Sequence, residues 1–521
     1  MTAGDINLAK SSDANKKPLI KDGHLFVLIH GLWGSPNHMS TIEELIQRLL
    51  PSSTSDKICT LRPSSFAFWK TYDGIQYISQ RVLQEIFFEI EALQKDLVKV
   101  VKISIIGYSL GGLIARCVIG LLYDLDFFTN VKPVIFTTFA TPHVGVQFFK
   151  ENLFDYTANR LGPFMFGQTG KELFIRDSNR LLADMANPSL SYYKGLALFE
   201  LRIVLSNVKN DRTVPFYTSF ITEYSPFDNW KYVKIKYIKD LPEATIGKAK
   251  VRPKFVDMRR TRNLSPEEAQ VFRGNIQEET SMIRRNRVLR FSSLVMIVCV
   301  FLPVWIPTVL CTSFLVSIFS VGQVRFLKKL NSSHHWSQIK SSVYDGKSNV
   351  DIENVNQGVV NRVERGRLSR QGSFKGETSE MTENTLEGIM YAREQLKQST
   401  EPNMDDDDSD ESLENEITNI GEINIKTNDD TVAKCIHDLK LQQENISIFT
   451  DASRLKLEDF KRDIIKNLNT LDWIKIPVFI DAWNSHDGIV ARRGPKTNPK
   501  GTSTIGLWCS ILRRHLKQES M

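Results

Sequence analysis

One continuous stretch, residues 100–112, constrains the fold more than any other part of this sequence. It opens with an apolar run rich in valine and isoleucine, which is typical of a buried strand in a parallel sheet. The run ends in Gly-Tyr-Ser-Leu-Gly at 107–111, and a helical pattern follows over 113–123. A strand, a tight Gly-x-Ser-x-Gly turn and a helix in this order predict that Ser109 is a nucleophile. An ordinary glycine-rich turn between a strand and a helix is the alternative.

Composition limits the class of protein. The 521 residues are 41% hydrophobic, enough for two or three average domains or one large domain with insertions. The net charge of +7 is modest, and the six cysteines show no paired spacing, so we expect free thiols in a reducing compartment. Residues 1–22 are polar and lack the apolar core of an ordinary secretory signal. The catalytic part is therefore expected to face the cytosol.

An earlier apolar run, residues 25–29, leads into His30-Gly31-Leu32. An early strand followed by His-Gly supplies half of an oxyanion hole in one class of serine hydrolases, because glycine lets the backbone approach the substrate closely. We expect the N–H of Leu32 to be one donor and the N–H of Leu110 to be the other. His30 precedes the serine, whereas the base follows it in that class, so a structural role is expected for His30.

Further strands and helices alternate along the first half of the chain. Isoleucine and valine recur every three or four residues over 75–90, which predicts an amphipathic helix. Residues 134–139 and 198–205 are predicted strands. This alternation indicates a mainly parallel sheet with helices on both faces. Residues 150–175 are aromatic and irregular, and either a cap over the acyl pocket or a helical excursion packed on the core fits them.

Two later residues complete a candidate triad. Asp211 lies in a loop after the predicted strand 198–205, where an acid can orient a histidine. His486 follows a short predicted strand at 474–480, which Pro477 makes an edge or irregular strand. The chain order Ser, Asp, His is the one expected. The other histidines after the serine fit less well: His143, which is given a structural role, His334, His335, His437 and His515.

Residues 291–324 contain no charged side chain. A single membrane span needs about 20 apolar residues and two spans about 40, so this segment is long for one and short for two. Basic residues flank both ends, which favours a hairpin with its two ends on one face. One tilted span with a proline kink at Pro303 and Pro307 is the alternative.

Five sequence blocks together resemble the fungal serine esterase/lipase family, a branch of the α/β hydrolases, and most of all its lipid-droplet phospholipase member. The blocks are residues 30–34, 107–112, 140–143, 210–215 and 486–487, and the resemblance covers 23–240 and 470–492. It implies the α/β-hydrolase fold, the triad Ser109, Asp211 and His486, and hydrolysis of acyl esters of glycerophospholipids. It also implies a location at the lipid droplet or the endoplasmic reticulum membrane, with the catalytic domain facing the cytosol.

The expected organisation has five parts. They are a flexible tail over 1–22, a hydrolase core over 23–280, a hydrophobic hairpin over 281–330, a disordered acidic insert over 331–430, and a closing part of the core over 431–521 that carries His486 and a basic tail. Disorder is predicted because eight acidic and no basic residues lie between Asn403 and Glu416. The insert is a departure from the family, and its role is unassigned.

The sequence shows no HExxH motif, no cysteine cluster and no phosphate-binding loop. We therefore expect no metal and no cofactor, and no nucleic-acid partner. The expected partners are a phospholipid or other lipid-ester substrate and a lipid-droplet or endoplasmic reticulum surface. Three alternatives remain: a triacylglycerol or sterol-ester lipase, a transacylase with the same triad, and a catalytically silent membrane adaptor with a hydrolase fold.

Overall fold

The structure is a computed structural model of the full chain. It describes residues 20–51, 54–149, 153–211, 213–246, 249–265, 267–268, 332–345, 423–425, 428–442, 446–482 and 484–520. The segment 291–324 with its predicted hairpin, and residues 346–422 of the predicted acidic insert, lie outside the described residues. Among the helices that are described, none is long and apolar enough to cross a membrane.

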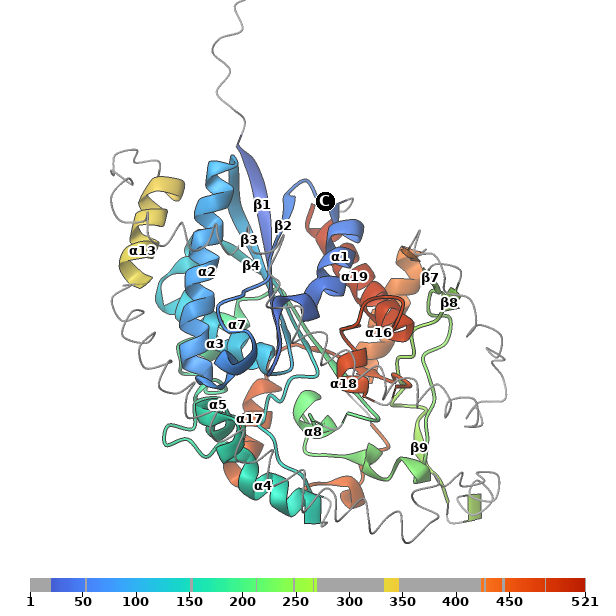
Figure 1. Ribbon diagram of the computed structural model, residues 1–521. Coiled ribbons are helices and arrows are strands. Elements are labelled where there is room, and N and C mark those ends of the chain that lie inside the picture. The colour runs from blue at the N-terminus through green and yellow to red at the C-terminus, as the bar shows by residue number, and fades with distance from the viewer. Residues whose placement is uncertain are drawn as a thin grey trace, which may run out of the picture.

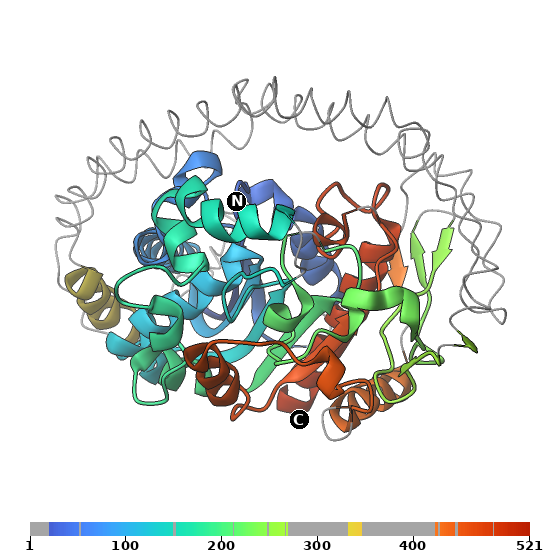
Figure 2. The same cartoon turned by 90° about the horizontal axis from the view of Figure 1, so that it is seen from below.

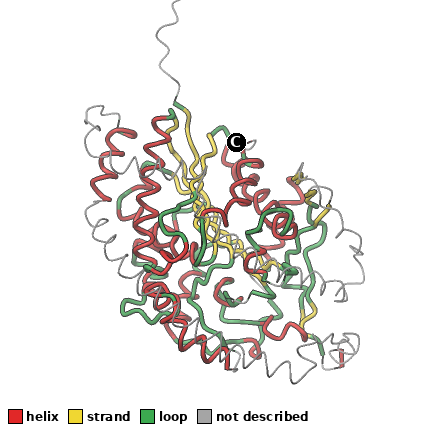
Figure 3. Tube along the Cα trace, in the orientation of Figure 1, coloured by secondary structure: helices red, strands yellow, loops and turns green. Residues whose placement is uncertain are grey.

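A six-stranded sheet runs through the middle of the molecule, and every neighbouring pair of its strands is parallel (Figures 1 and 3). The strand order is β11-β5-β4-β3-β1-β2. The bounds are β1 Lys21–Ile29, β2 Lys57–Leu61, β3 Val98–Tyr108, β4 Lys132–Phe139, β5 Leu201–Asn207 and β11 Ile474–Val478. The predicted parallel α/β architecture is confirmed, and β11 with Pro477 is an edge strand, as predicted.

Helices cover both faces of the sheet (Figure 1). One face carries α2 Ile75–Lys95, α3 Leu110–Asp124 and α7 Ser191–Ala197, and the other carries α1 Ser40–Leu49, α16 Asp429–Leu441 and α19 Pro499–Ser520. The sequence dictates the placement of α2, because its predicted apolar stripe is buried against the sheet: Ile75, Ile78, Val82, Ile86 and Ile90. With apolar helices on both sides, β1 is buried from Leu25 to Ile29.

The remaining elements lie mostly around the carboxyl ends of the strands, the end that Figure 2 views. The helices are α4 Leu153–Met165, α5 Gly167–Leu173, α6 Leu181–Asp184, α8 Phe216–Ser219, α17 Asp459–Leu468 and α18 Ser485–Gly488. Short strands form a three-stranded sheet, with β7 Ala244–Ile246 between β10 Ile423–Ile425 and β8 Ala249–Val251, and a pair of β6 Val233–Lys234 with β9 Arg262–Asn263. The segment 153–173 therefore forms helices at the end of the sheet where the nucleophile lies.

Two predicted boundaries differ from the structure. β1 begins at Lys21, inside the predicted tail. Residues 332–345 were expected in the acidic insert, but Ser332–Ile339 forms helix α13, because Trp336 and Ile339 are buried against α2 and Trp336 stacks on Phe87.

The C-terminal segment forms α19 because apolar residues precede the basic ones. Ile505, Trp508 and Leu512 recur at helical spacing and are buried in the core against α1 and β4. The basic residues of the predicted tail lie at the end of this helix and bind acidic partners. Lys517 Nζ lies 3.1 Å from an Asp429 carboxylate oxygen, for example.

Candidate active site

Ser109 occupies the turn between β3 and α3 in a conformation that few side chains adopt. Its φ is 55° and its ψ is −126°. A non-glycine residue with positive φ costs of order 1–3 kcal/mol and persists only where its surroundings impose it. Here the Ser109 N–H donates to the Phe139 carbonyl at 2.9 Å, and the Ser109 carbonyl accepts from the Thr141 hydroxyl at 2.9 Å. The strand-turn-helix predicted from the sequence therefore has the geometry of a nucleophile elbow.

The glycines around Ser109 are required by close approach of the backbone. A Cβ added to Gly107 would lie 2.3 Å from the Gly112 Cα, and one added to Gly111 would lie 2.1 Å from the Ile29 carbonyl oxygen. Real Cβ atoms essentially never make contacts this short. The first and last glycines of the Gly-x-Ser-x-Gly pentapeptide thus allow β3, α3 and the end of β1 to meet at the serine.

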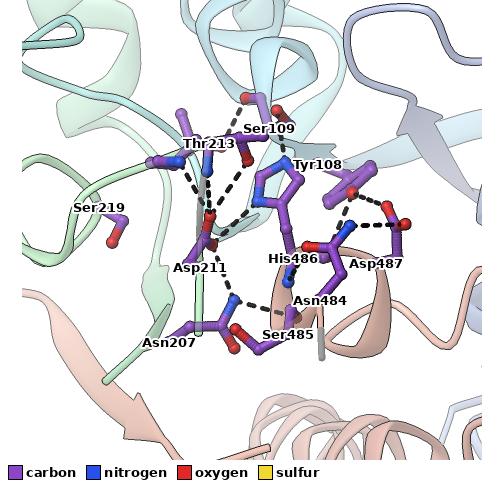
Figure 4. A network of polar contacts seen from close by, with 12 residues as sticks. Tyr108, Ser109, Asn207, Asp211, Thr213, Ser219, Asn484, Ser485, His486 and Asp487 are labelled. Atoms are coloured by element: carbon purple, nitrogen blue, oxygen red, sulfur yellow. Dashed lines mark hydrogen bonds and ion pairs between the residues drawn. The ribbon is translucent and has the colours of Figure 1, made fainter. Parts of the chain in front are cut away.

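The structure brings the three predicted triad residues together (Figure 4). The Ser109 hydroxyl donates to His486 Nε2 at 3.0 Å, and His486 Nδ1–H donates to Asp211 Oδ2 at 2.9 Å. All three side chains are buried or nearly so. The chain crosses 377 sequence positions between the serine and the histidine. An unbroken path of hydrogen bonds therefore runs from the serine oxygen to the carboxylate.

Four neighbouring donors hold the Asp211 carboxylate in place besides His486. Oδ1 accepts from the backbone N–H and the hydroxyl of Thr213, both at 3.1 Å, and from the Val214 N–H at 2.9 Å. Oδ2 accepts from the Asn207 side-chain amide at 2.9 Å. With these donors the carboxylate has partners at both oxygens, which favours its ionised form.

Burial and charge act in opposite directions on the pKa values of the pair. Burial alone would raise the pKa of the Asp211 carboxyl, but the charge of His486 and the donated hydrogen bonds outweigh it and lower this pKa. Burial alone would lower the pKa of the His486 imidazole, but the Asp211 carboxylate outweighs it and raises this pKa above 6.5. The carboxylate therefore makes the imidazole a stronger base towards Ser109.

Sequence reasoning missed three residues that position the triad. Asn207, at the end of β5, donates to Asp211 and to the Ser485 carbonyl at 3.1 Å, so it holds both sides of the site. The Tyr108 hydroxyl donates to the His486 carbonyl at 3.1 Å, and the Asn484 side chain accepts from the His486 N–H at 3.3 Å. Their nearness in sequence to the three triad residues was the only signal available.

The two predicted oxyanion donors flank the serine. Leu110 is the first residue of α3, so its N–H has no partner within the helix. The loop that carries Leu32 passes so close that a Cβ added to Gly31 would lie 2.7 Å from the Ser109 Cβ and 3.3 Å from its Oγ. The Leu32 N–H makes no hydrogen bond to any described residue. Both N–H groups are thus available beside the nucleophile.

The histidines that the sequence assigned to structural roles are built into the core. His30 is fully buried, stacks on Phe66 with ring centroids 4.1 Å apart and lies with Nδ1 3.0 Å from the Gly31 carbonyl oxygen. Burial lowers its pKa to about 4. His143 is also fully buried and hydrogen-bonds Thr138 at 2.9 Å. In the part of the chain that the structure describes, no group of three or more His, Cys, Asp or Glu side chains is placed to hold a metal ion.

Comparison with known proteins agrees with this geometry. Residues 20–223 match the family described as "Putative serine esterase (DUF676)". This part of the chain is similar to that family. The match ends before β11 and α18, so it includes Ser109 and Asp211 and leaves out His486.

Two curated relatives are similar over the same part of the chain. "Putative lipase C4A8.10" of Schizosaccharomyces pombe is 30% identical over 210 residues, which cover 38% of this chain and 26% of the relative. "Putative lipase ROG1" of Saccharomyces cerevisiae is 30% identical over 208 residues, which cover 38% of this chain and 28% of the relative. The chain thus spans about a quarter of the length of the curated relatives it matches.

Among solved structures, an "Alpha/beta hydrolase fold protein from Nakamurella multipartita" aligns at 11% identity over 39% of this chain and 80% of its own. The TM-score of that alignment is 0.20. The α/β-hydrolase fold of this chain follows from its own sheet order and from the sharp turn at Ser109.

Proposed function

We propose that the protein is a serine lipase that hydrolyses acyl ester bonds of glycerophospholipids. The observation that carries the proposal is the unbroken path of hydrogen bonds from Ser109 through His486 to Asp211, with the serine held at a φ of 55°. A strained, hydrogen-bonded serine beside two free backbone N–H groups fits acyl transfer better than a purely structural turn. The relatives' printed names support a lipid ester as the substrate.

The reaction follows from the roles that the geometry allows. His486 Nε2 accepts the Ser109 proton as Oγ attacks the ester carbonyl carbon, and Asp211 stabilises the imidazolium that forms. The N–H groups of Leu32 and Leu110 donate to the oxyanion of the tetrahedral intermediate. The imidazolium then gives its proton to the leaving alcohol. Water, activated by the same histidine, attacks the acyl-enzyme and releases the fatty acid.

The experiment compares purified wild-type protein with Ser109→Ala on a panel of phospholipids, triacylglycerols and sterol esters. We expect fatty acid release from phospholipids by wild type alone. Preferential release from triacylglycerols or sterol esters would assign the same triad to a neutral-lipid lipase. Acyl transfer to an added alcohol in place of hydrolysis would assign it to a transacylase. No release from any ester would refute the proposal and favour a silent adaptor.

We propose further that the protein works at the surface of lipid droplets or of the endoplasmic reticulum, with its catalytic part facing the cytosol. Ser109 precedes the uncharged segment 291–324 and His486 follows it, yet the two are hydrogen-bonded at 3.0 Å. This bond supports a hairpin, because a single span would separate the two residues by a membrane. Helix α4 adds an apolar surface at the same end as the site, with Tyr156 64%, Leu161 48% and Phe164 66% exposed.

Protease protection tests this location. Tags at residues 1 and 521 are both expected to be cleaved in intact microsomes or droplets, and deletion of 291–324 is expected to release the protein into the soluble fraction. Protection of one tag would contradict the hairpin. Protein that stays on the membrane after the deletion would contradict the role of the segment.

A further inference from the structure

The loop that carries the oxyanion donor Leu32 is a tight turn with a strained residue. The Gly34 N–H donates to the Gly31 carbonyl at 3.1 Å, which closes a four-residue turn. Trp33, its third residue, has a φ of 56°, a position that glycine usually occupies because a side chain there is strained. A turn of this kind needs outside contacts to keep its central peptide in one orientation.

Thr71 makes the contact that the strained turn needs. The Trp33 N–H donates to the Thr71 Oγ1 at 3.2 Å. The Thr71 hydroxyl in turn donates to the Phe68 carbonyl at 2.6 Å, which turns a lone pair of Oγ1 towards Trp33. The Phe68 N–H donates to the Gly34 carbonyl at 2.8 Å. These reciprocal bonds tie the turn at 31–34 to the 3₁₀-helix Phe68–Tyr72.

Thr71 is itself held from the other side. It is fully buried, and its carbonyl accepts from the Thr169 hydroxyl of α5 at 2.7 Å. The Thr169 oxygen also accepts from the Gly74 N–H at 2.9 Å. The hydroxyl of Thr71 therefore has little freedom to move away from Trp33.

We infer that Thr71 is a positioning residue for the oxyanion hole, an inference that rests on the proposed function. It does not touch the substrate. It fixes the peptide between Leu32 and Trp33, and with it the direction of the adjoining Leu32 N–H. Because the oxyanion forms only during the reaction, a misdirected donor weakens binding of the transition state and leaves binding of the ground state almost unchanged.

The experiment measures kcat and KM of full-length Thr71→Val on a short soluble ester, since valine keeps the shape and removes the hydroxyl. Loss of an oxyanion donor outright costs about 10²- to 10³-fold in kcat, so loss of its support is expected to cost about ten- to a hundredfold. KM is expected to stay within about threefold. Thr71→Ser restores the hydroxyl and is expected to return kcat to within about threefold of wild type.

Thr137→Val is the matched control, because Thr137 is a buried threonine on β4 whose oxygen accepts from the Trp508 ring N–H at 3.2 Å. Its kcat is expected to stay within about twofold. A second readout is inhibition by a trifluoromethyl ketone, which forms an oxyanion on Ser109. For Thr71→Val its Ki is expected to rise in step with the fall in kcat/KM, as a transition-state analogue should.

An unchanged kcat in folded Thr71→Val, an equal loss in Thr137→Val, a loss confined to KM, or an unchanged Ki would each overturn the inference. If Thr71→Val does not fold, Thr71→Ala serves in its place, and failure of Thr71→Ser to restore kcat would also overturn it. Activity that disappears in Ser109→Ala but persists in Thr71→Val would leave the proposed function standing and remove only this inference. Activity that persists in Ser109→Ala would remove the proposed function.

Discussion

The serine and the histidine of the candidate site are positioned by two different kinds of structure. Ser109 lies in one continuous stretch, between β3 and α3, and the glycines of that stretch let neighbouring backbone pack closely around it. His486 lies in α18, a helix of only four residues, and is held by partners far away in sequence. Tyr108 is 378 positions from it and Asp211 is 275 positions from it.

The two sides of the site therefore differ in what positions them, which is close backbone packing for the serine and side-chain hydrogen bonds for the histidine. The nucleophile side depends on backbone fit, so a single added Cβ at Gly107 or Gly111 disrupts it. The histidine side depends on hydrogen bonds between elements, chiefly through Asn207 and Tyr108. Single substitutions on the nucleophile side should therefore abolish activity outright. Loss of one hydrogen bond on the histidine side should lower kcat only in part, by an amount that depends on the bond removed.

The largest expected effect is shared by the two sides. Ser109→Ala and His486→Ala should each lower kcat on a soluble ester by about 10⁶-fold while the protein stays folded, because neither works without the other. Steady-state kinetics with circular dichroism of each variant makes the test. If His486→Ala keeps activity that His143→Ala or His515→Ala loses, the wrong histidine has been assigned.

Asn207→Ala tests the histidine side by itself. The substitution removes the hydrogen bonds to Asp211 and to the Ser485 carbonyl together. Misplacement of a catalytic group by about 1 Å can lower the reaction rate by about 10²-fold. We expect kcat to fall about ten- to a hundredfold with little change in KM. Asn469→Ala is the control, because its amide joins the same two parts of the chain through the Ile221 carbonyl at 3.1 Å. Equal losses in both variants would mean that Asn207 only supports the fold.

The fold was largely predictable from sequence because its signals are local. The apolar runs of β1, β3 and β4 and the stripe of α2 each identify one element by its own pattern. The strand β2 was missed because Lys57–Leu61 is short and half-exposed. The helix α19 was missed because the basic residues at its end indicated an exposed segment, although the residues around Trp508 are buried.

The site was predictable only where a motif or the chain order specified it. Ser109, Leu32 and Leu110 belong to short motifs, whereas Asp211 and His486 could be selected only by their order after the serine. Asn207 and Thr71 carry no motif. Their importance comes from hydrogen bonds to Ser485 and Trp33, which depend on how distant segments pack.

Tyr108→Phe should lower kcat less than Asn207→Ala does. The hydroxyl donates to the His486 carbonyl at 3.1 Å and lies 3.3 Å from an Asp487 carboxylate oxygen, while the ring is retained by phenylalanine. One hydrogen bond is worth about 1 kcal/mol, so we expect kcat to fall less than about fivefold. Denaturant unfolding should show a loss of about 1 kcal/mol. A fall in kcat as large as that of Asn207→Ala would contradict the expectation that each hydrogen bond on the histidine side contributes separately.

Glu172→Gln should change pH-dependent stability and leave kcat unchanged. Glu172 is buried, and its carboxylate accepts from the Ile75 N–H at the start of α2 at 2.5 Å. Burial raises its pKa from 4.5 to about 7. A raised pKa stabilises the fold below pH 4.5, and this stability is lost as the pH rises through about 7.

The free energy of unfolding of wild type, relative to Glu172→Gln, should therefore fall by up to about 3 kcal/mol between pH 4.5 and pH 8. Denaturant titrations of both proteins across this range provide the measurement. A difference that does not change with pH would contradict the assignment of the titration to Glu172.

In the proposed mechanism, His486, supported by Asp211, activates Ser109. The most direct test of this activation is the rate of covalent labelling by a fluorophosphonate as a function of pH, with the modified residue identified by mass spectrometry. We predict a single adduct on Ser109, formed ever more slowly as the pH falls through the pKa of His486, which Asp211 raises above 6.5. The rate in His486→Ala should be low at every pH. An adduct on another residue, or a rate on Ser109 that neither pH nor His486→Ala changes, would contradict this mechanism.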